Sequence, residues 1–188
     1  MKKRILISIS LIMALSMSTQ AQKLRTGIKV GANLSQLASI EGAVSKPGLN
    51  AGIFLNSKLG PVGIQADFLY KRMGSKYETP VLLNDYEERT LNLDYIQIPV
   101  VAKFHPVPML NAHAGPYFGY LINVDDESDL LGKDDFVKTD FGLTFGLGFK
   151  ISRLMLEARY GVGLVDVFEK DGTEYNNSSL SFNVGFEL

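Results

Sequence analysis

Apolar and polar residues alternate along most of the chain, most clearly in FGLTFGLGFKISRLMLEARYGVGL, residues 141–164. The odd positions from Phe141 to Phe149 are apolar, whereas the even positions hold glycine, threonine and lysine. A period of two places successive side chains on opposite faces of a β-strand. A helix would scatter the apolar groups, and each interior glycine would cost about 1 kcal/mol relative to alanine. Leu154 to Leu164 repeat the pattern, so the two runs predict a hairpin.

The same period predicts eight strands. They cover about residues 27–37, 48–57, 62–72, 91–104, 111–122, 136–150, 154–165 and 179–188. In the fourth, Leu91 and Leu93 fall on the face opposite to Ile96 and Ile98, which indicates a bulge or a strand that projects beyond the apolar zone. Pro99 in the same strand indicates a local irregularity.

The predicted connections between these strands alternate in length. The long, polar connections are residues 38–47, 74–90, 123–135 and 166–178, and the short ones are 58–61, 105–110 and 151–153. Antiparallel strands with long loops at one end and tight turns at the other are typical of an up-and-down barrel of the outer membrane, whose short turns face the periplasm. The predicted fold class is therefore all-β, an eight-stranded antiparallel up-and-down transmembrane β-barrel with both termini on the periplasmic side.

The first residues have the pattern of an export signal. Lys2, Lys3 and Arg4 precede the apolar run 5–17, and Thr19-Gln20-Ala21 supplies small residues at positions −3 and −1 of a cleavage site. A retained membrane anchor is the alternative, but the run is shorter than the roughly 20 residues that a spanning helix needs. We therefore predict a signal peptide over residues 1–21 and a barrel domain over residues 22–188.

Composition narrows the classes of protein that remain. The chain has no cysteine, which excludes disulfides and a lipid anchor on cysteine. Its net charge of −1 argues against a nucleic-acid partner held by a general positive field. After the N-terminal segment, charges and glycines interrupt every apolar run, so a mature protein in a membrane would have to cross it as a barrel.

Alternation alone leaves open which face of the barrel is outside. A soluble carrier of the lipocalin type keeps apolar residues inside and polar residues outside. Here the polar face consists largely of glycine, asparagine, serine and isolated charges, which suits a narrow interior. The opposite face carries large apolar side chains on every strand, more than the few hundred Å² that a soluble monomer usually exposes. We therefore expect lipid around the apolar face.

Charged residues on the polar face nearly balance in sign. The cations are Lys29, Lys71, Lys103, Lys150 and Arg159, and the anions are Asp67, Asp94, Asp140, Glu157 and Glu187. An eight-stranded barrel is just wide enough for side chains to fill its interior. The sequence therefore predicts an ion-paired interior without a wide pore, and leaves the pairing open.

Candidate catalytic residues are few. His105 and His113 both map to the periplasmic end, whereas a lipid-modifying enzyme of the outer leaflet would need its residues on the outer loops. Glu157 and Arg159 share a strand face and could form an acid with an electrostatic partner. Interior ion pairs and structural histidines explain these residues better, so we predict no catalytic residue and no enzyme.

The acidic segment NVDDESDLLGKDD, residues 123–135, raises the question of calcium. A helix-loop-helix calcium site needs glycine at its sixth position and glutamate at its twelfth, and here Leu130 and Phe136 stand there. A solvated loop is the expectation, with calcium bridging to surface polysaccharide as the alternative. The chain also lacks a phosphate-binding glycine loop, a nucleophile elbow and zinc-ligand spacing, so no cofactor or metal site is predicted.

Several segments in order resemble one known family. They are GIKVGANLSQL, LDYIQIPVVAKF, HAGPYFGYLI, DFGLTFGLGFKI, LEARYGVGLVDV and SSLSFNVGFEL. They look like the outer-membrane β-barrel domain family of Bacteroidetes-type bacteria, which includes the PorT-like proteins and is similar to the small OmpX and OmpA barrels. The resemblance covers essentially the whole mature chain. One departure is Leu188, because such barrels commonly end in an aromatic residue.

The resemblance implies an outer-membrane location in a Gram-negative cell envelope and is weak for activity. The expected function is a non-enzymatic structural or interaction role through the extracellular loops. Outer-membrane lipid is the expected partner, together with envelope proteins or surface polysaccharide at the loops, and no nucleic acid. The alternatives are a narrow, porin-like solute channel, a secretion-associated PorT-like component and, less well supported, a soluble lipocalin-like carrier.

Overall fold

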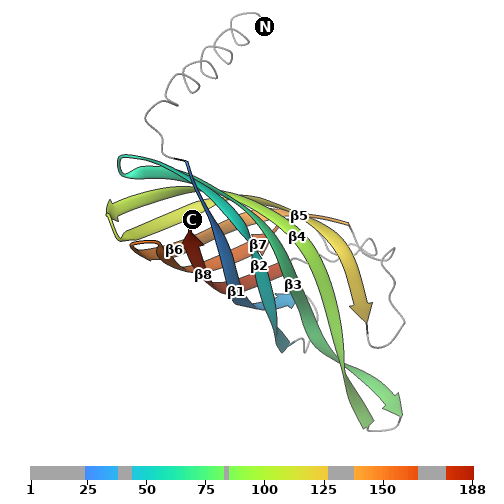
Figure 1. The fold of residues 1–188 in the computed structure, drawn as a ribbon. Coiled ribbons are helices and arrows are strands. Elements are labelled where there is room, and N and C mark those ends of the chain that lie inside the picture. Colours follow the sequence, from blue (N-terminus) through green and yellow to red (C-terminus); the bar gives the residue numbers. More distant parts are fainter. Residues whose placement is uncertain (1–23, 38–43, 83–84, 127–137, 165–176) are drawn as a thin grey trace, which may run out of the picture.

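The computed structural model describes residues 24–37, 44–82, 85–126, 138–164 and 177–188, which form a closed barrel (Figure 1). Its strands are β1 (Arg25–Leu37), β2 (Val44–Leu59), β3 (Val62–Leu82), β4 (Asp85–Val107), β5 (Leu110–Asp126), β6 (Thr139–Ile151), β7 (Leu154–Gly163) and β8 (Asn177–Glu187). Each strand pairs antiparallel with the next, and β8 returns to β1. The predicted fold class, an all-β eight-stranded antiparallel up-and-down barrel, is confirmed. The predicted signal peptide lies outside the described residues.

Tight turns and both ends of the barrel domain lie at the same end. The turns consist of Gly60-Pro61, Pro108-Met109 and Ser152-Arg153, as the short predicted connections require. Gly60 has a φ of 60°, a left-handed conformation that glycine adopts without the steric cost of a side chain. Gly27 near the start of β1 lies opposite Glu187 at the end of β8. In an outer membrane this is the periplasmic end.

One predicted loop is wrong. Residues 74–90 were expected to form a long polar connection, but β3 continues to Leu82 and β4 begins at Asp85. The two strands remain paired to the tip, where Leu82 lies opposite Asp85. Figure 1 shows this green hairpin extending beyond the other strands, away from the start of β1 and the end of β8. Strand pairing needs no apolar side chains once a register is set, so a polar sequence can continue a sheet.

Other strand ends differ by a few residues from the prediction. Strand β2 begins at Val44 rather than residue 48, and β5 continues to Asp126 rather than residue 122. Strand β6 begins at Thr139, and the predicted start at Phe136 lies outside the described residues. The end that was predicted for the seventh strand, residue 165, also lies outside them.

The bulge that was one alternative for the fourth strand lies in its neighbour, and the other alternative, a strand that projects beyond the apolar zone, fits β4, which begins at Asp85. Between Asp94 and Tyr95 the partner on β5 jumps from Asn123 to Leu121, so Ile122 is the extra residue of a bulge in β5. Strand β4 itself keeps its alternation, and Leu93 is buried inside the barrel. Around Pro99 the pairing of β4 is interrupted without a change of register.

Asp94 was expected inside the barrel, and this expectation is wrong. It shares the outward phase of Ile96 and Ile98 and lies opposite Arg72, whose side chain is exposed on the outside. The carboxylate is buried by its neighbours on the outer surface rather than by the lumen. Asn123, brought to the outside by the bulge, also donates to it, with 3.4 Å between Nδ2 and Oδ2.

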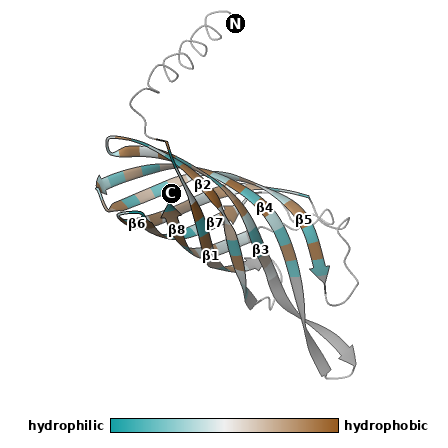
Figure 2. Ribbon diagram, in the orientation of Figure 1, coloured by the Kyte–Doolittle hydropathy of each residue, from teal (hydrophilic) through white to brown (hydrophobic). Residues whose placement is uncertain are grey.

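The outside of the barrel is apolar and the inside is polar, and Figure 2 shows hydrophobic and hydrophilic residues alternating along the strands. Large apolar side chains are exposed on every strand, among them Ile28, Val30, Ile53, Leu55, Ile64, Phe68, Ile98, Phe104, Phe118, Phe145, Leu147, Leu156, Phe182 and Phe186. Asparagine, serine and charged side chains occupy the alternate, buried positions. This arrangement is the reverse of a soluble carrier and fits a barrel surrounded by lipid. No helix among the described residues has the length and apolarity to cross a bilayer.

Candidate functional site: the barrel interior

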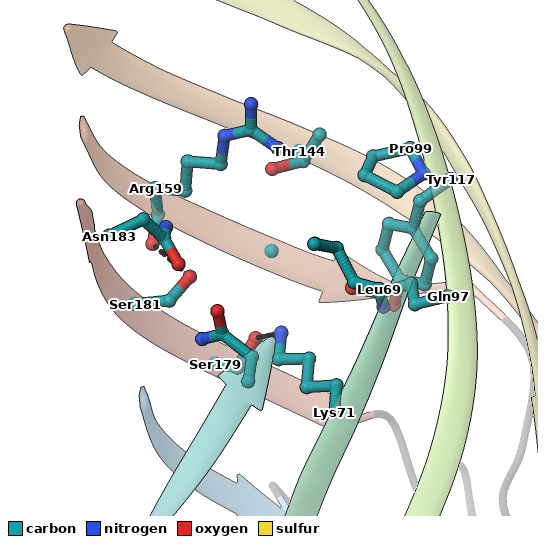
Figure 3. A pocket seen from close by; sticks show the side chains of 12 residues that line it. Leu69, Lys71, Gln97, Pro99, Tyr117, Thr144, Arg159, Ser179, Ser181 and Asn183 are labelled. Carbon is teal, nitrogen blue, oxygen red and sulfur yellow. Dashed lines mark hydrogen bonds between the residues drawn. The ribbon is translucent and has the colours of Figure 1, made fainter. Parts of the chain in front are cut away.

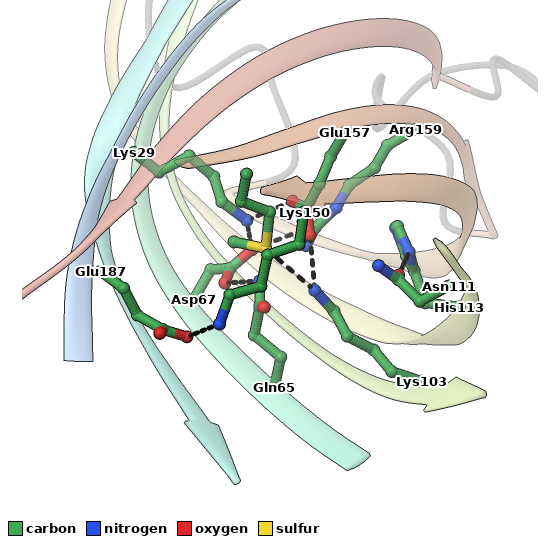
Figure 4. Close-up of polar contacts among 11 residues, drawn as sticks. Lys29, Gln65, Asp67, Lys103, Asn111, His113, Lys150, Glu157, Arg159 and Glu187 are labelled. Atoms are coloured by element: carbon green, nitrogen blue, oxygen red, sulfur yellow. Dashed lines mark hydrogen bonds and ion pairs between the residues drawn. The ribbon is translucent and has the colours of Figure 1, made fainter. Parts of the chain in front are cut away.

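A network of buried charges crosses the lumen (Figure 4). Lys29 on β1 contacts two carboxylates, with its Nζ 2.9 Å from Asp67 Oδ2 and 2.5 Å from Glu157 Oε2. Lys103 on β4 contacts the other oxygen of Glu157 at 2.6 Å. All four side chains are at most 1% exposed. They come from β1, β3, β4 and β7, so the network joins strands that are not neighbours in the sheet.

Arg159 closes the network into a ring. Its Nη1 donates to Asp67 Oδ2 at 2.5 Å, and its Nη2 lies 3.0 Å from Glu157 Oε2. Gln65 donates to the second oxygen of Asp67 at 2.6 Å. Both carboxylates are therefore held on each oxygen by a cation or an amide. Such pairing offsets part of the large cost of removing these charges from water.

A second, smaller set of ion pairs lies at the periplasmic mouth. Glu187 on β8 accepts from Lys150 Nζ at 2.5 Å and from Arg25 Nη1 at 3.0 Å. These side chains are more exposed than those of the network, with 49% exposure at Arg25 and 21% at Lys150. Figure 4 shows Lys150 joined to Glu187 and not to the carboxylates of the central network.

Lys71 and Asp140 lie on the extracellular side of the network. Lys71 Nζ donates to Ser179 Oγ at 2.8 Å, and Tyr117 donates to Asp140 Oδ1 at 3.3 Å. Both charged side chains are buried. The cavity in this region is only about 20 Å³, roughly enough for one water molecule. Figure 3 shows Lys71, Ser179, Arg159 and Tyr117 around it.

Sequence reasoning missed the apolar residues inside the lumen. Leu69, Met73, Leu93, Tyr95 and Leu121 are all at most 5% exposed. All but Leu121 share the inward phase of polar residues on β3 and β4. This shared phase could have identified them as interior residues from the sequence. Together with the charged ring they fill the lumen, and the cavity of about 20 Å³ lies between them. The described part of the barrel therefore has no open pore.

Glycines make room for the larger inward side chains. A Cβ at Gly27 would lie 2.3 Å from the ring of Phe54, which is buried inside the barrel. A Cβ at Gly148 would lie 2.4 Å from the amide of Asn111 on the next strand. The alternation of glycine with large residues thus reflects close packing across neighbouring strands.

The two histidines lie far from the loop end of the barrel. His113 is buried in the lumen, with Nδ1 3.0 Å from Asn111 Oδ1. His105 lies at the end of β4 beside the periplasmic turns. Among the described residues no group of three or more histidine, aspartate or glutamate side chains is arranged to hold a metal ion. The acidic segment weighed for calcium, residues 123–135, lies mostly outside the described residues.

Acidic residues are concentrated in the four segments that were predicted as long connections at the other end, one of which is largely the hairpin of β3 and β4. Fifteen of the 20 acidic residues, but only five of the 19 lysines and arginines, fall in residues 38–47, 74–90, 123–135 and 166–178. These segments carry a net charge of −10 in a chain whose total is −1. The extracellular end of the barrel is therefore strongly acidic by composition.

The closed sheet, apolar exterior and polar interior define a transmembrane β-barrel of the outer-membrane class. The chain belongs to the family described as outer membrane protein beta-barrel domain, whose model matches residues 20–169. No curated protein sequence matches the chain.

Solved structures share this fold at low sequence identity. Neisserial surface protein A is 16% identical, with a TM-score of 0.59 over 87% of this chain and 97% of that one. Ail, the attachment invasion locus protein of Yersinia pestis, solved with the heparin analogue sucrose octasulfate, is 13% identical. Its TM-score is 0.51 over 88% of this chain and 99% of that one. At these identities the likeness extends to the fold alone.

Proposed function

We propose that this protein is a non-enzymatic interaction protein of the outer membrane that binds its partner at the extracellular end of the barrel. The observation that carries the proposal is the filled lumen. Lys29, Lys103 and Arg159 pair with Asp67 and Glu157 across the middle of the barrel. Because transport through this interior would require breaking buried ion pairs, recognition belongs outside the barrel.

The projecting hairpin of β3 and β4 provides a part of that end whose backbone is paired. Its strands remain paired from Gly74 and Asn92 to the tip, so the backbone there is held by ladder hydrogen bonds. A paired hairpin presents its side chains with less loss of conformational entropy on binding than an unstructured loop of the same length.

The charge of the loop end indicates the chemistry of the partner. With a net charge of −10, its segments favour a cationic partner such as a lysine- or arginine-rich protein segment. Ail was solved with a polyanion, and we propose the opposite preference for this chain. Anionic surface polysaccharide would need bridging divalent cations.

The other candidate functions have less support from the described interior. A narrow solute channel would need a route past the central ring of charges. A PorT-like role in secretion and placement among Bacteroidetes-type proteins remain predictions from the sequence resemblance, as does export through the signal peptide.

Two assays test the proposal. The first is conductance in a planar bilayer, where we expect no steps from the intact protein. The second is binding of a fluorescent lysine-rich peptide, and separately of fluorescent heparin, to cells that display the protein. We expect salt-sensitive binding of the peptide and none of heparin. Step conductances would favour the channel, and binding of heparin in preference to the peptide would overturn the proposed charge preference.

Two hairpin variants make the binding assay specific. Glu78 and Glu88 lie opposite each other, so residues 79–87 can be replaced by an Asn-Gly turn. The second variant keeps the hairpin but carries Asp85→Asn, Glu87→Gln and Glu88→Gln. Weaker peptide binding by both would support the proposal, and unchanged binding by both would remove the hairpin from it.

A further inference from the structure

A basic pocket opens at the periplasmic mouth of the barrel, at the opposite end from the proposed interaction surface. It has a volume of about 300 Å³, and its lining includes Arg25, Lys58, His105 and Lys150. This volume lies at the lower end of the range of roughly 300–1,000 Å³ that is typical of small-molecule sites. We propose that this pocket binds a small phosphate-type anion from the periplasm.

The basic residues reach the pocket from four strands of the inner face. Arg25 has the inward phase of Gly27 and Lys29 on β1, and Lys58 has the inward phase of Phe54 and Asn56 on β2. His105 has the inward phase of Lys103 on β4. Lys150 has the inward phase of Gly148 on β6. The cavity is therefore the mouth of the lumen and not a groove on the lipid-facing wall.

Charges in and around the pocket do not cancel. Three cations line it, and its lining contains no carboxylate. Glu187 pairs with Arg25 and Lys150 together, while Lys58 has no ion pair with any residue that the structure describes. The mouth thus keeps a net charge of about +2 when histidine is neutral. An anion entering it would meet uncompensated positive charge.

His105, which lines the same pocket, has a ring nitrogen without a partner among the described residues. Its Nδ1 is shielded from solvent and has no hydrogen-bond partner among the described residues. The backbone holds this residue in place, because its N–H donates to the carbonyl of Pro61 at 2.7 Å. A buried polar atom without a partner costs free energy, and a bound anion would give it one if the ring turned a protonated Nδ1 toward the pocket.

A tetrahedral oxyanion fits this set of donors. The planar guanidinium of Arg25 offers several N–H groups to phosphate oxygens, and the lysines act as mobile point charges. The ring of ion pairs around Lys29 lies deeper in the lumen, along the strand β1 that also carries Arg25. The pocket is therefore closed at its inner end, which suits binding of an anion rather than its transport through the barrel. A lipid head group would have to leave the bilayer and enter the lumen, which favours a soluble anion.

The test is titration of the detergent-solubilised, folded protein with inorganic phosphate at constant ionic strength. Binding is measured by calorimetry and by broadening of the ³¹P resonance. We expect saturable binding that is weakened at least tenfold by Lys58→Gln and by Lys150→Gln. Lys58→Arg should retain it. The matched control is Arg153→Gln, which removes a positive charge from the neighbouring turn, outside the lining of the pocket.

Folding and ligand source are controlled separately. Each variant should migrate as a compact form on an unboiled detergent gel before it is titrated. If Arg153→Gln weakened phosphate binding as much as the pocket variants do, or if chloride competed as well as phosphate, the binding would reflect only the general positive charge of the mouth. Either outcome would overturn the proposed site. Binding only to phosphatidylglycerol vesicles, with none to soluble phosphate, would also overturn it. None of these three results would affect the proposed extracellular function.

Discussion

The guanidinium of Arg159 on β7 lies 2.5 Å from the carboxylate of Asp67 on β3, although 92 positions separate the two residues in sequence. These strands are not neighbours in the barrel. The contact therefore crosses the lumen and adds to the ladder hydrogen bonds a second kind of long-range connection. Because Glu157 also contacts Lys29 and Lys103, loss of one member affects several strands together.

Removing one carboxylate from this network should destabilise the barrel. Glu157→Gln keeps the shape of the side chain but leaves Lys103 without its carboxylate, and Lys29 and Arg159 keep Asp67 alone. Breaking a buried pair in this way typically costs about 3–5 kcal/mol. We expect a loss of that order in the free energy of unfolding, measured by urea titration of the protein in lipid vesicles.

The matched control for this variant is Glu187→Gln at the periplasmic mouth. Its partners Arg25 and Lys150 are partly exposed to solvent, so solvent screens these pairs more than the central network and we expect a smaller loss. Equal losses from the two variants would contradict a special role for the central network.

Packing between β5 and β6 gives a second prediction. Gly148 lies opposite Asn111, and a Cβ at Gly148 would come within 3.0 Å of three side-chain atoms of Asn111. Gly148→Ala should therefore lower the fraction of compact, heat-modifiable protein on a detergent gel. Asn111→Ala should rescue it, because the clash involves the side chain and not the backbone. Failure of the rescue, with Asn111→Ala alone folding normally, would contradict the packing argument.

The orientation of the two faces can be measured directly because the chain contains no tryptophan. Phe145 is 48% exposed on the outside, and Phe54 is 1% exposed inside the barrel. A single tryptophan at Phe145→Trp should be strongly quenched by lipids brominated on their acyl chains. The control Phe54→Trp should be quenched much less. Equal quenching at both positions would contradict the closed barrel in lipid.

The strands were predictable because a β-barrel in lipid imposes a period of two on every segment that crosses the bilayer. Phe141 to Phe149 alternate with glycine, threonine and lysine for this reason, and the same rule located eight strands and three tight turns. Outside the bilayer, lipid no longer requires an apolar residue at every second position. Residues 75–82 and 85–91 have no sustained alternation of apolar and polar residues and still pair as strands, so hydrophobic periodicity could not distinguish them from a loop.

Other features depend on contacts that periodicity does not contain. The bulge at Ile122 lies on β5, whereas the change of phase that suggested it was read from Leu93 on β4. The charge of Asp94 suggested an interior position, whereas its place in the alternation of β4 is that of an outward residue. Its ion pair with Arg72 on the outer surface explains how a carboxylate can lie there. Which cation meets which carboxylate across the lumen depends on side-chain reach, and the sequence left it open.

The pair of Arg72 and Asp94 on the outer surface gives the last prediction. Arg72 binds both oxygens of Asp94, through Nε at 2.7 Å and Nη2 at 3.1 Å. The carboxylate is only 6% exposed although it faces outward. Arg72→Met would leave it without a cation, and because the arginine is half exposed we expect a loss of about 1–2 kcal/mol in the free energy of unfolding.

A double variant distinguishes this pair from simple loss of packing. Arg72→Met with Asp94→Leu replaces both charges by apolar side chains, which is often close to neutral in stability. The two apolar side chains would also lie next to the apolar outer surface that includes Phe68 and Ile96, and would enlarge it. We therefore expect the double variant to recover most of the stability lost in Arg72→Met, measured by the same urea titration. Additive losses would show that the two residues contribute independently, and would contradict a coupled pair at the rim of the apolar surface.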